Sequence, residues 1–417
     1  MMQSAAAVPL AAQVGVAAKP TNSVYARLGI RPVINAYGTV TTLGGTLLLP
    51  EVKQAMEEAS QNFVPLVELQ RKVGQRLAEL TGAEGALVTC GAAAALCLAT
   101  CAVTAGSDAA KMNCLPDLTG MKSEIVIQKA HRNGYDHAFR MVGVKLVVVE
   151  TADEMRRAIN EKTAAVAMVL SHGAQGHKVE LDETISIAHA AGVPLILDAA
   201  AEIPPADNLR KYVKMGADLV AFSGGKEMRG PQCSGVLLGR RTLIDAAFRN
   251  SSPYSHFARI AKVGKEEMVG LMTAVEMALS RDEAVERRNR ETALKRVAST
   301  LDGIPTVHTE FIPNLDLSHS PRLSVQWDYA KLGLSPNDVV NQLKEGEPSI
   351  IAADMTHYQP AWKGLGIFAN QLKPRRRDDR RETRARDSQR ESEGVKLKNC
   401  AAGRYNSRRD AEGWRSS

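Results

Sequence analysis

Lys226 is the side chain whose position in this sequence most strongly indicates chemistry. It follows the apolar run 217–223 in the segment Ser223-Gly-Gly-Lys, so it lies just past the expected end of a strand. Asp198 ends another apolar run, 28 residues earlier. A buried amine has a lowered pKa and acts as a nucleophile or forms a Schiff base. A buried carboxylate is costly unless a cationic group meets it.

A phosphate site is indicated after an earlier apolar run, residues 85–90. Gly91 makes a turn, and Ala92 and Ala93 open a helix whose first N–H groups carry almost no side-chain bulk. A buried alanine-rich helix is the alternative explanation. Together, the phosphate cradle, the carboxylate and the Ser-x-x-Lys segment indicate pyridoxal phosphate, whose ring nitrogen pairs with a carboxylate and whose aldehyde binds a lysine. The alternative is a metabolite-binding domain in which Lys226 is a surface residue.

Three further side chains are candidates for the same site. His131 and Arg132 follow the apolar run 124–129, and Arg229 lies three residues after Lys226. A planar guanidinium matches a carboxylate or a phosphate, so we expect the two arginines to bind anionic groups of a substrate. The alternatives are a structural role for the histidine and a surface role for each arginine.

Strands alternate with amphipathic helices in the part of the chain that must position these residues. The expected strands are residues 85–90, 124–129, 145–150, 164–170, 193–199, 217–223 and 234–239. Their nearly continuous apolar character is typical of strands covered on both faces. The alternation predicts an α/β fold with a mostly parallel, doubly wound sheet. The last two strands are too close in sequence for a crossover helix, which favours an antiparallel pair.

A smaller α+β domain is predicted to begin near residue 260. Residues 264–301 indicate a long helix or a helix pair, 321–328 a strand, 335–346 a helix starting at Ser335, and 347–354 another strand. The predicted organisation is a disordered leader over 1–21, a large cofactor-binding domain over 22–259, the small domain over 260–373 and a basic disordered tail over 374–417.

Charge and cysteine content restrict the class of protein. Residues 373–417 hold 15 Lys+Arg and 8 Asp+Glu, which accounts for the whole net charge of +7. The rest of the chain holds 38 basic and 38 acidic residues and is neutral. The neutral body offers no electrostatic footprint for nucleic acid. The six cysteines form no CxxC pair, and no spacing indicates a metal site or disulfides, which favours a reducing compartment and a cytoplasmic location. No apolar run is long enough to span a bilayer.

These motifs resemble those of fold-type I pyridoxal-phosphate enzymes with a seven-stranded large domain. More narrowly, the chain resembles the selenocysteine synthase-like family, which includes L-seryl-tRNA(Sec) selenium transferases and D-glucosaminate-6-phosphate ammonia-lyases. The resemblance covers about residues 22–373. It is carried by RPVINAYGTVTTLGG (31–45), KAHRNGYDHAF (129–139), LILDAAAE (195–202) and SGGKEMRGPQCSGVLLGRR (223–241).

The resemblance implies a role for individual residues. Lys226 corresponds to the Schiff-base lysine and Asp198 to the partner of the ring nitrogen. His131 is expected over the cofactor ring, and Ser171 or His172 near the ring hydroxyl. The phosphate is expected on Gly91, Ala92, Ala93 and Ser223. The family also implies a homodimer or a higher homo-oligomer, because such sites usually form between subunits.

Two departures favour the ammonia-lyase-like branch over the selenium transferases. The transferases carry an N-terminal tRNA-binding domain, whereas about 20 residues precede the similar region here. They also show NLGR where this chain has TLGG (42–45), so a substrate-binding arginine is missing. We therefore expect a small-molecule substrate, no tRNA and no membrane partner. The tail after residue 374 departs from the expected last helix, which indicates a shifted reading frame or a degenerate end.

The hypothesis for function is a pyridoxal-phosphate-dependent lyase. It would catalyse α,β-elimination of a hydroxylated amino acid, such as an amino-sugar acid, to a 2-keto acid and ammonia. Lys226 would remove the Cα proton after the substrate amine displaces it. The first alternative is selenium transfer to seryl-tRNA, which shares the elimination half-reaction. The second is an inactive paralogue that binds cofactor without turnover.

Overall fold

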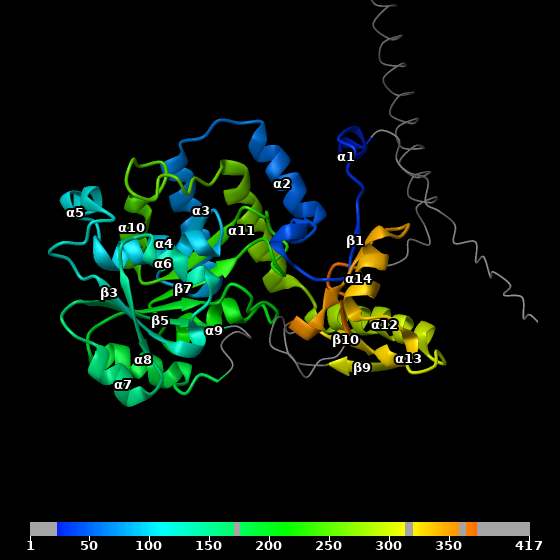
Figure 1. The fold of residues 1–417 in the computed structure, drawn as a ribbon. Helices are drawn as coiled ribbons and strands as arrows, with labels where there is room; N and C mark the ends of the chain where they lie inside the picture. The colour runs from blue at the N-terminus through cyan, green and yellow to red at the C-terminus, as the bar shows by residue number, and fades with distance from the viewer. Residues whose placement is uncertain (1–22, 171–175, 313–319, 358–363, 373–417) are drawn as a thin grey trace, which may run out of the picture. The chain divides into compact units, whose positions relative to one another are not determined.

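The structure is a computed structural model that describes residues 23–170, 176–312, 320–357 and 364–372. The expected leader, the expected tail, and both Ser171 and His172 lie outside the described residues. Among the described residues, no helix is both long and apolar enough to cross a membrane. Figure 1 shows the described chain from the N-terminal arm in blue to the C-terminal strands in orange.

All seven expected strands are present and form one sheet. They are β2 (Gly85–Thr89), β3 (Glu124–Gln128), β4 (Lys145–Val149), β5 (Thr163–Val169), β6 (Leu195–Asp198), β7 (Leu219–Ser223) and β8 (Gly235–Gly239). Their order is β2-β8-β7-β6-β5-β3-β4. Strand β8 runs antiparallel to both of its neighbours, and the other pairs are parallel. The predicted fold class and the antiparallel last strand are confirmed.

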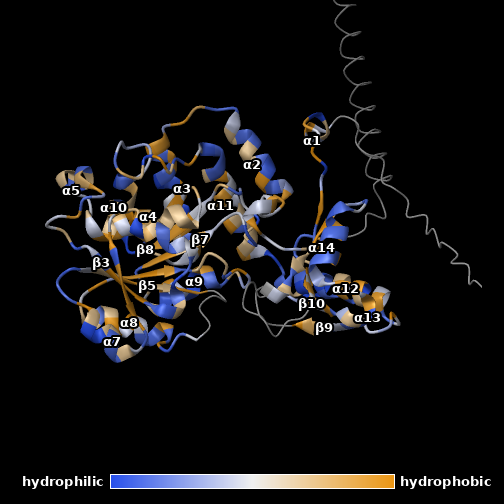
Figure 2. Ribbon diagram, in the orientation of Figure 1, coloured by the Kyte–Doolittle hydropathy of each residue, from blue (hydrophilic) through white to orange (hydrophobic). Residues whose placement is uncertain are grey.

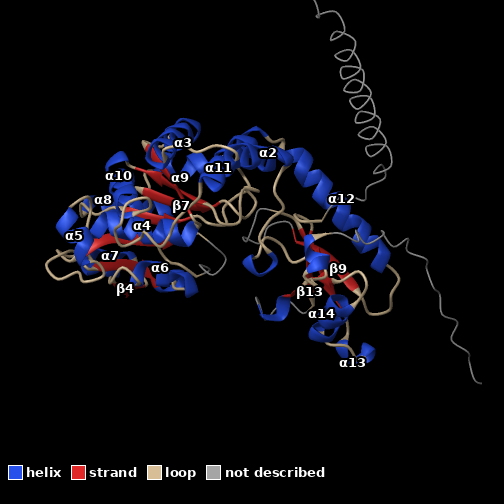
Figure 3. Cartoon of the chain, turned by 90° about the horizontal axis from the view of Figure 1, so that it is seen from above, coloured by secondary structure: helices blue, strands red, loops and turns tan. Residues whose placement is uncertain are grey.

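Helices cover both faces of this sheet, which explains why its strands are apolar throughout. Along β3, Ile125 and Ile127 face one hydrophobic core, whereas Val126 faces the other. The first core is completed by α4 (Ala92–Thr104), α5 (Ala109–Cys114), α6 (His137–Arg140) and α10 (Arg241–Asn250). The second is completed by α2 (Pro50–Ser60), α3 (Leu66–Thr81), α7 (Ala152–Ala158), α8 (Leu181–Ala190), α9 (Asn208–Met215) and α11 (Lys265–Ser280). Figure 2 shows strands of this sheet in hydrophobic orange, and Figure 3 shows the strands in red among the blue helices.

A smaller C-terminal domain contains an antiparallel sheet. Its strands, in the order β12-β13-β10-β9, are β12 (Ala353–Asp354), β13 (Leu365–Phe368), β10 (Arg322–Gln326) and β9 (His308–Ile312). The helices are α12 (Glu283–Leu301), α13 (Tyr329–Leu332) and α14 (Pro336–Glu345). Ser335 caps α14 as expected, and the Asp338 carboxylate in return accepts a hydrogen bond from the Ser335 amide. The boundary near residue 260 remains a prediction.

Three details differ from the sequence-based expectation for this domain. Of the two alternatives expected for the segment 264–301, the structure has the helix pair, because Asp282 caps a new helix directly after α11 ends. The segment 347–354 forms two short strands rather than one, and strands β9 and β13 were not expected. The first of those two, β11 (Ile350–Ile351), pairs in parallel with β1 (Ile34–Asn35) of the N-terminal arm, which also contains α1 (Val24–Arg27).

Candidate active site

The predicted site residues converge on one edge of the seven-stranded sheet. Ser223 pairs with Gly235 at the start of β8, and Gly235 pairs with Thr89 at the end of β2. Asp198, at the end of β6, pairs with Ala221 of β7. The turn after β2, the end of β6 and the end of β7 therefore lie side by side. Ligands bind at such an edge in open α/β sheets.

Asp198 and Lys226 form the electrostatic centre of this edge. The Asp198 carboxylate is 7% exposed, and one of its oxygens accepts a hydrogen bond of 3.0 Å from the Ala200 amide. Burial raises the pKa of Asp198, although the Ala200 amide and the Lys226 ammonium act in the opposite direction. Burial lowers the pKa of Lys226, against the carboxylates of Asp198 and Glu202. The amine is thereby poised as a proton acceptor.

The glycines beside Lys226 pack closely against other parts of the chain. A Cβ on Gly224 would lie 2.2 Å from the Ser234 hydroxyl oxygen, and one on Gly225 would lie 2.8 Å from the Cα of Gln232. Both glycines therefore fold the lysine turn against the protein's own chain. The Gly224 amide completes this turn by donating a 2.9 Å hydrogen bond to the Ser234 carbonyl.

The turn into α4 has the shape of an anion cradle. Gly91 has a φ of 126°, a conformation that favours glycine, and the space beside it is open. Ala92 and Ala93 begin the 13-residue helix, whose first N–H groups lack intrahelical acceptors and can bind an anion. Gly235 packs directly against the Gly91–Ala92 peptide. A Cβ on Gly235 would lie 2.6 Å from the Gly91 carbonyl carbon and 2.8 Å from the Ala92 nitrogen.

His131 lies buried behind this edge with no hydrogen-bond partner at either ring nitrogen among the described residues. It is 1% exposed, and its ring centroid lies 5.5 Å from that of His177. Burial, together with the neighbouring His177, lowers the pKa of His131 to about 4. The imidazole is therefore neutral at physiological pH. A neutral, unbonded ring suits contact with a flat ligand better than a structural hydrogen bond.

Lys226 opens into a pocket of about 410 Å³. One wall comes from the segment Tyr37–Thr42, which contributes hydroxyl groups. The small domain also lines the pocket, through Ala353, Met355, Phe368 and Asn370. Tyr135 also lines this pocket and a second cavity of about 660 Å³ that includes Ala93.

Neither predicted substrate-binding arginine lines the lysine pocket. Arg132 pairs instead with buried Asp136 at 2.5 Å, and its side chain is 37% exposed. Arg229 has a φ of 62°, in the left-handed region that a non-glycine residue rarely adopts. Burial and then the guanidinium of Arg281 lower its pKa. The roles proposed for these two arginines therefore lack the support of the pocket geometry.

Residues 48–264 match the aminotransferase class-V family. The chain is 34% identical over 365 residues to the D-glucosaminate-6-phosphate ammonia lyase of Salmonella typhimurium (strain 14028s / SGSC 2262), covering 85% of this chain and 94% of that enzyme. The chain belongs to the aminotransferase class-V family. A solved D-glucosaminate-6-phosphate ammonia-lyase structure superposes with a TM-score of 0.74 at 33% identity, over 85% of this chain and 95% of that one.

Two other relatives are named for different activities. A 5'-C-glycyluridine monooxygenase-decarboxylase of Streptomyces sp is also 34% identical, over 79% of this chain and 84% of its own. The L-seryl-tRNA(Sec) selenium transferase of Rhizobium meliloti (strain 1021) is 31% identical over 272 residues, 57% of this chain and 54% of that enzyme. The selenium transferase match is thus shorter and weaker. The resemblance inferred from the motifs is confirmed.

Pyridoxal phosphate is the cofactor of this class-V chain, and the described residues fit it. The open cradle at Gly91 matches a phosphate, and the buried carboxylate of Asp198 keeps capacity for a cationic ring nitrogen. The amine of Lys226 lies within electrostatic reach of that carboxylate. Lysine, carboxylate and phosphate cradle are the donor set that this cofactor requires.

Several residues important to the geometry were missed by sequence reasoning. Gly235 packs against the Gly91–Ala92 peptide, and a Cβ on Gly45 would lie 2.4 Å from the Gly225 carbonyl oxygen. Only the folded chain brings these residues together. Glu227, a buried acid beside Lys226, could have been identified from the sequence, because an acidic residue after a strand end needs a partner. Asn370 could not, since it follows a short strand that was itself not expected.

Proposed function

We propose that the protein is a pyridoxal-phosphate-dependent lyase that removes water and ammonia from a hydroxylated amino acid. An amino-sugar acid is the proposed substrate class. The observation that carries the proposal is the poised Lys226 amine facing a hydroxyl-lined pocket of about 410 Å³. Support also comes from the similarity over most of both chains to an enzyme named D-glucosaminate-6-phosphate ammonia lyase.

Each proposed role follows from the position of the residue. Bound pyridoxal phosphate supplies an electron sink next to the amine-bearing carbon. Lys226 Nζ, whose pKa is lowered by burial, accepts the Cα proton and can return it to the departing β-hydroxyl. Asp198 would balance positive charge on the ring nitrogen, and His131 would pack over the ring. Gly91, Ala92, Ala93 and Ser223 hold the phosphate.

The overall reaction balances without an external oxidant. The Cα–H and Cβ–O bonds break, water leaves, and hydrolysis of the resulting enamine gives a 2-keto acid and ammonia. Ser171 or His172 is proposed to contact the ring hydroxyl, and Arg132 and Arg229 to meet anionic groups of the substrate. We also propose a cytoplasmic location, a homodimer or higher homo-oligomer, and no tRNA partner.

The decisive experiment is a screen of amino-sugar acids and hydroxy-amino acids for release of keto acid and ammonia. The purified protein loaded with pyridoxal phosphate is expected to convert at least one of them, and Lys226→Ala is expected to abolish both release and the Schiff-base absorbance band. Full activity of Lys226→Ala would overturn the mechanism. A Schiff-base band without turnover of any compound would favour the inactive paralogue.

A second candidate is oxidative decarboxylation, because the relative named 5'-C-glycyluridine monooxygenase-decarboxylase has the same 34% identity. The same screen distinguishes the two reactions. Elimination releases ammonia without consuming oxygen, whereas a monooxygenase-decarboxylase consumes oxygen and releases carbon dioxide. Selenium transfer, the third candidate, requires binding of seryl-tRNA, which a gel-shift measurement tests directly.

A further inference from the structure

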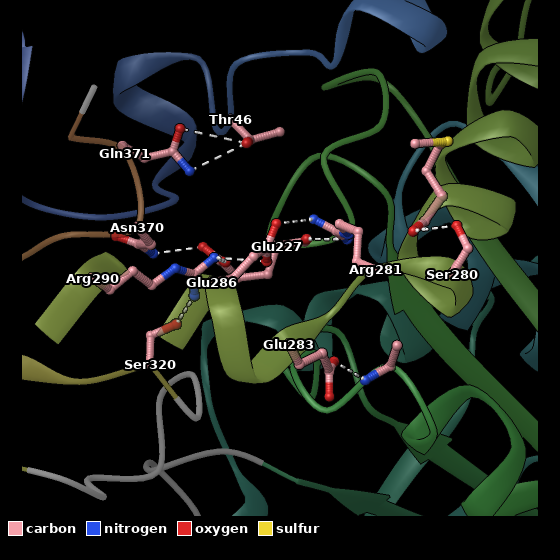
Figure 4. A network of polar contacts seen from close by, with 12 residues as sticks. Thr46, Glu227, Ser280, Arg281, Glu283, Glu286, Arg290, Ser320, Asn370 and Gln371 are labelled. Carbon is pink, nitrogen blue, oxygen red and sulfur yellow. Dashed lines mark hydrogen bonds and ion pairs between the residues drawn. The ribbon is translucent and has the colours of Figure 1, made fainter. Parts of the chain in front are cut away.

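Glu227, the residue after the proposed Schiff-base lysine, is held at three points. Its Oε1 accepts a 2.6 Å hydrogen bond from Asn370 Nδ2, and its Oε2 pairs with Arg290 Nη2 at 2.8 Å. Its main-chain carbonyl accepts a further hydrogen bond of 3.2 Å from Arg281 Nη2. Figure 4 shows Glu227 between Asn370 and Arg290 on one side and Arg281 on the other. The Glu227 side chain is 2% exposed, so water competes little for these contacts.

The other hydrogen bonds of the lysine turn, residues 224–234, stay inside the turn. The Gly224 amide donates a 2.9 Å hydrogen bond to the Ser234 carbonyl, and the Lys226 carbonyl accepts one of 2.9 Å from the amide three residues further on. These bonds shape the turn without fixing it to its surroundings. Within the described part of the chain, hydrogen bonds from this turn to other elements are made by Glu227 alone.

The two arginines that hold Glu227 are themselves fixed by a shared partner. Glu286 of α12 pairs at 3.6 Å with Arg290 and at 3.6 Å with Arg281, which lies at the junction of α11 and α12. Arg290 also donates a hydrogen bond to the hydroxyl of buried Ser320. A guanidinium is planar and its donors point in fixed directions. The contacts to Glu286 and Ser320 therefore determine where the Glu227 carboxylate must lie.

Glu227 is placed to act on Lys226 through the backbone rather than through its charge. The charge of Glu227 is matched by Arg290. Burial lowers the pKa of Lys226, and the carboxylates that oppose this shift are those of Asp198 and Glu202. Consecutive residues are joined by a rigid, planar peptide, so a displacement of Glu227 displaces Lys226 as well.

We propose that Glu227 is a positioning residue, which holds the lysine turn so that Lys226 Nζ meets the aldehyde carbon of pyridoxal phosphate. The amine nitrogen bonds to this carbon and water leaves, so the reaction depends on the place and direction of Nζ. A misplacement of about 1 Å can slow a bond-forming step about a hundredfold. The inference rests on the Schiff-base role proposed for Lys226 and is independent of the lyase reaction.

The test separates formation of the Schiff base from binding of the cofactor. Pyridoxamine 5'-phosphate carries an amine in place of the aldehyde, so it can occupy the site without bonding to Lys226. With apo protein and pyridoxal phosphate, Glu227→Gln should slow the appearance of the Schiff-base absorbance band about tenfold or more. The affinity of this variant for pyridoxamine phosphate, measured by equilibrium dialysis, should stay within about twofold of the parent's, because the phosphate cradle belongs to another turn.

Glu291→Gln is the matched control. Glu291 lies on the same helix as Arg290, but it pairs with Arg287 at 3.0 Å and has no printed contact with the lysine turn. This variant should behave as the parent does in both measurements. Gly235→Ala provides the opposite comparison, since it disturbs the cradle and should weaken the binding of both compounds.

A second variant covers the case in which Glu227→Gln folds poorly. Glu227→Met combined with Arg290→Met replaces the buried ion pair by apolar side chains, an exchange that is often nearly neutral for stability, and it should show the same selective loss. Schiff-base formation at the parent's rate, or equal weakening of both compounds, would overturn the proposal. A Lys226→Ala protein that still develops the absorbance band would instead show that the Schiff-base role proposed for Lys226 is wrong.

Discussion

The backbone oxygen of Gly225 lies 2.4 Å from the place that a Cβ on Gly45 would occupy. The tip of Gln232 lies closer still, at 1.7 Å, but a flexible side chain can move away, whereas the lysine turn cannot. Gly45 is the last residue of TLGG, the segment in which the motif resemblance leads one to expect the arginine of NLGR. The arm and the lysine turn therefore approach so closely that only glycine fits at position 45. An arginine side chain has no space there.

Replacing Gly45 should disturb the position of Lys226. Gly45→Ala is expected to lower both the fraction of protein that holds cofactor and kcat, because the new methyl group pushes the Gly225 carbonyl. The adjacent Gly44 provides the control, since it has a φ of 81° with nothing within 4 Å of its Cβ position. Gly44→Ala should cost about 1 kcal/mol of stability from backbone strain and leave the Schiff-base absorbance unchanged. Equal cofactor occupancy in the two variants would contradict this explanation.

Gly235 should control phosphate binding through the Gly91 turn. A Cβ at this position overlaps the Gly91–Ala92 peptide, so Gly235→Ala is expected to weaken pyridoxal-phosphate affinity about tenfold or more, corresponding to at least about 1.4 kcal/mol. Equilibrium dialysis of the apo protein measures it. Gly82→Ala changes a helix-ending glycine with open space around it and is expected to bind the cofactor normally.

His131 should make the apo protein sensitive to mild acid. Its folded pKa is about 4 and its unfolded value about 6.5, so between these pH values the unfolded state binds the additional proton. Stability is therefore lost as the pH falls from about 6.5 to 4, by about 3 kcal/mol in total. The free energy of unfolding, measured with denaturant and plotted against pH, can be compared for the apo protein and for His131→Leu. The two plots should run parallel above pH 7 and diverge below 6.5. A constant difference over the whole range would show that His131 is not the group responsible.

Removing Arg290 should destabilise the protein strongly, because it leaves Glu227 buried with an unpaired charge. The expected loss for Arg290→Met is about 3–5 kcal/mol, compared with at most about 1 kcal/mol for breaking the exposed Arg287–Glu291 pair with Arg287→Met. Thermal unfolding of both variants checks the difference. A double variant that also carries Glu227→Gln should recover part of the loss, since the neutral amide is less costly to bury.

The sheet and the centre of the site were predictable because local sequence specifies them. Continuous apolar runs mark strands buried on both faces, and Asp198 and Lys226 follow such runs directly. The position of Asn370 was not predictable, since its contact with Glu227 joins residues 143 apart in the chain. The roles of Gly45 and Gly235 depend on distances below 3 Å in the folded state, and a sequence pattern contains no such distances.

The pairing of Ile34 with Ile350 has a consequence for how the molecule comes into being. During synthesis the N-terminal arm leaves the ribosome first, yet its partner strand is made more than three hundred residues later. The seven-stranded sheet can close before then, because its last strand ends at Gly239. Strand β1 of the arm, whose following segment lines the pocket, therefore pairs only after β11 has been synthesised. A complete active site is among the last features that the nascent protein acquires.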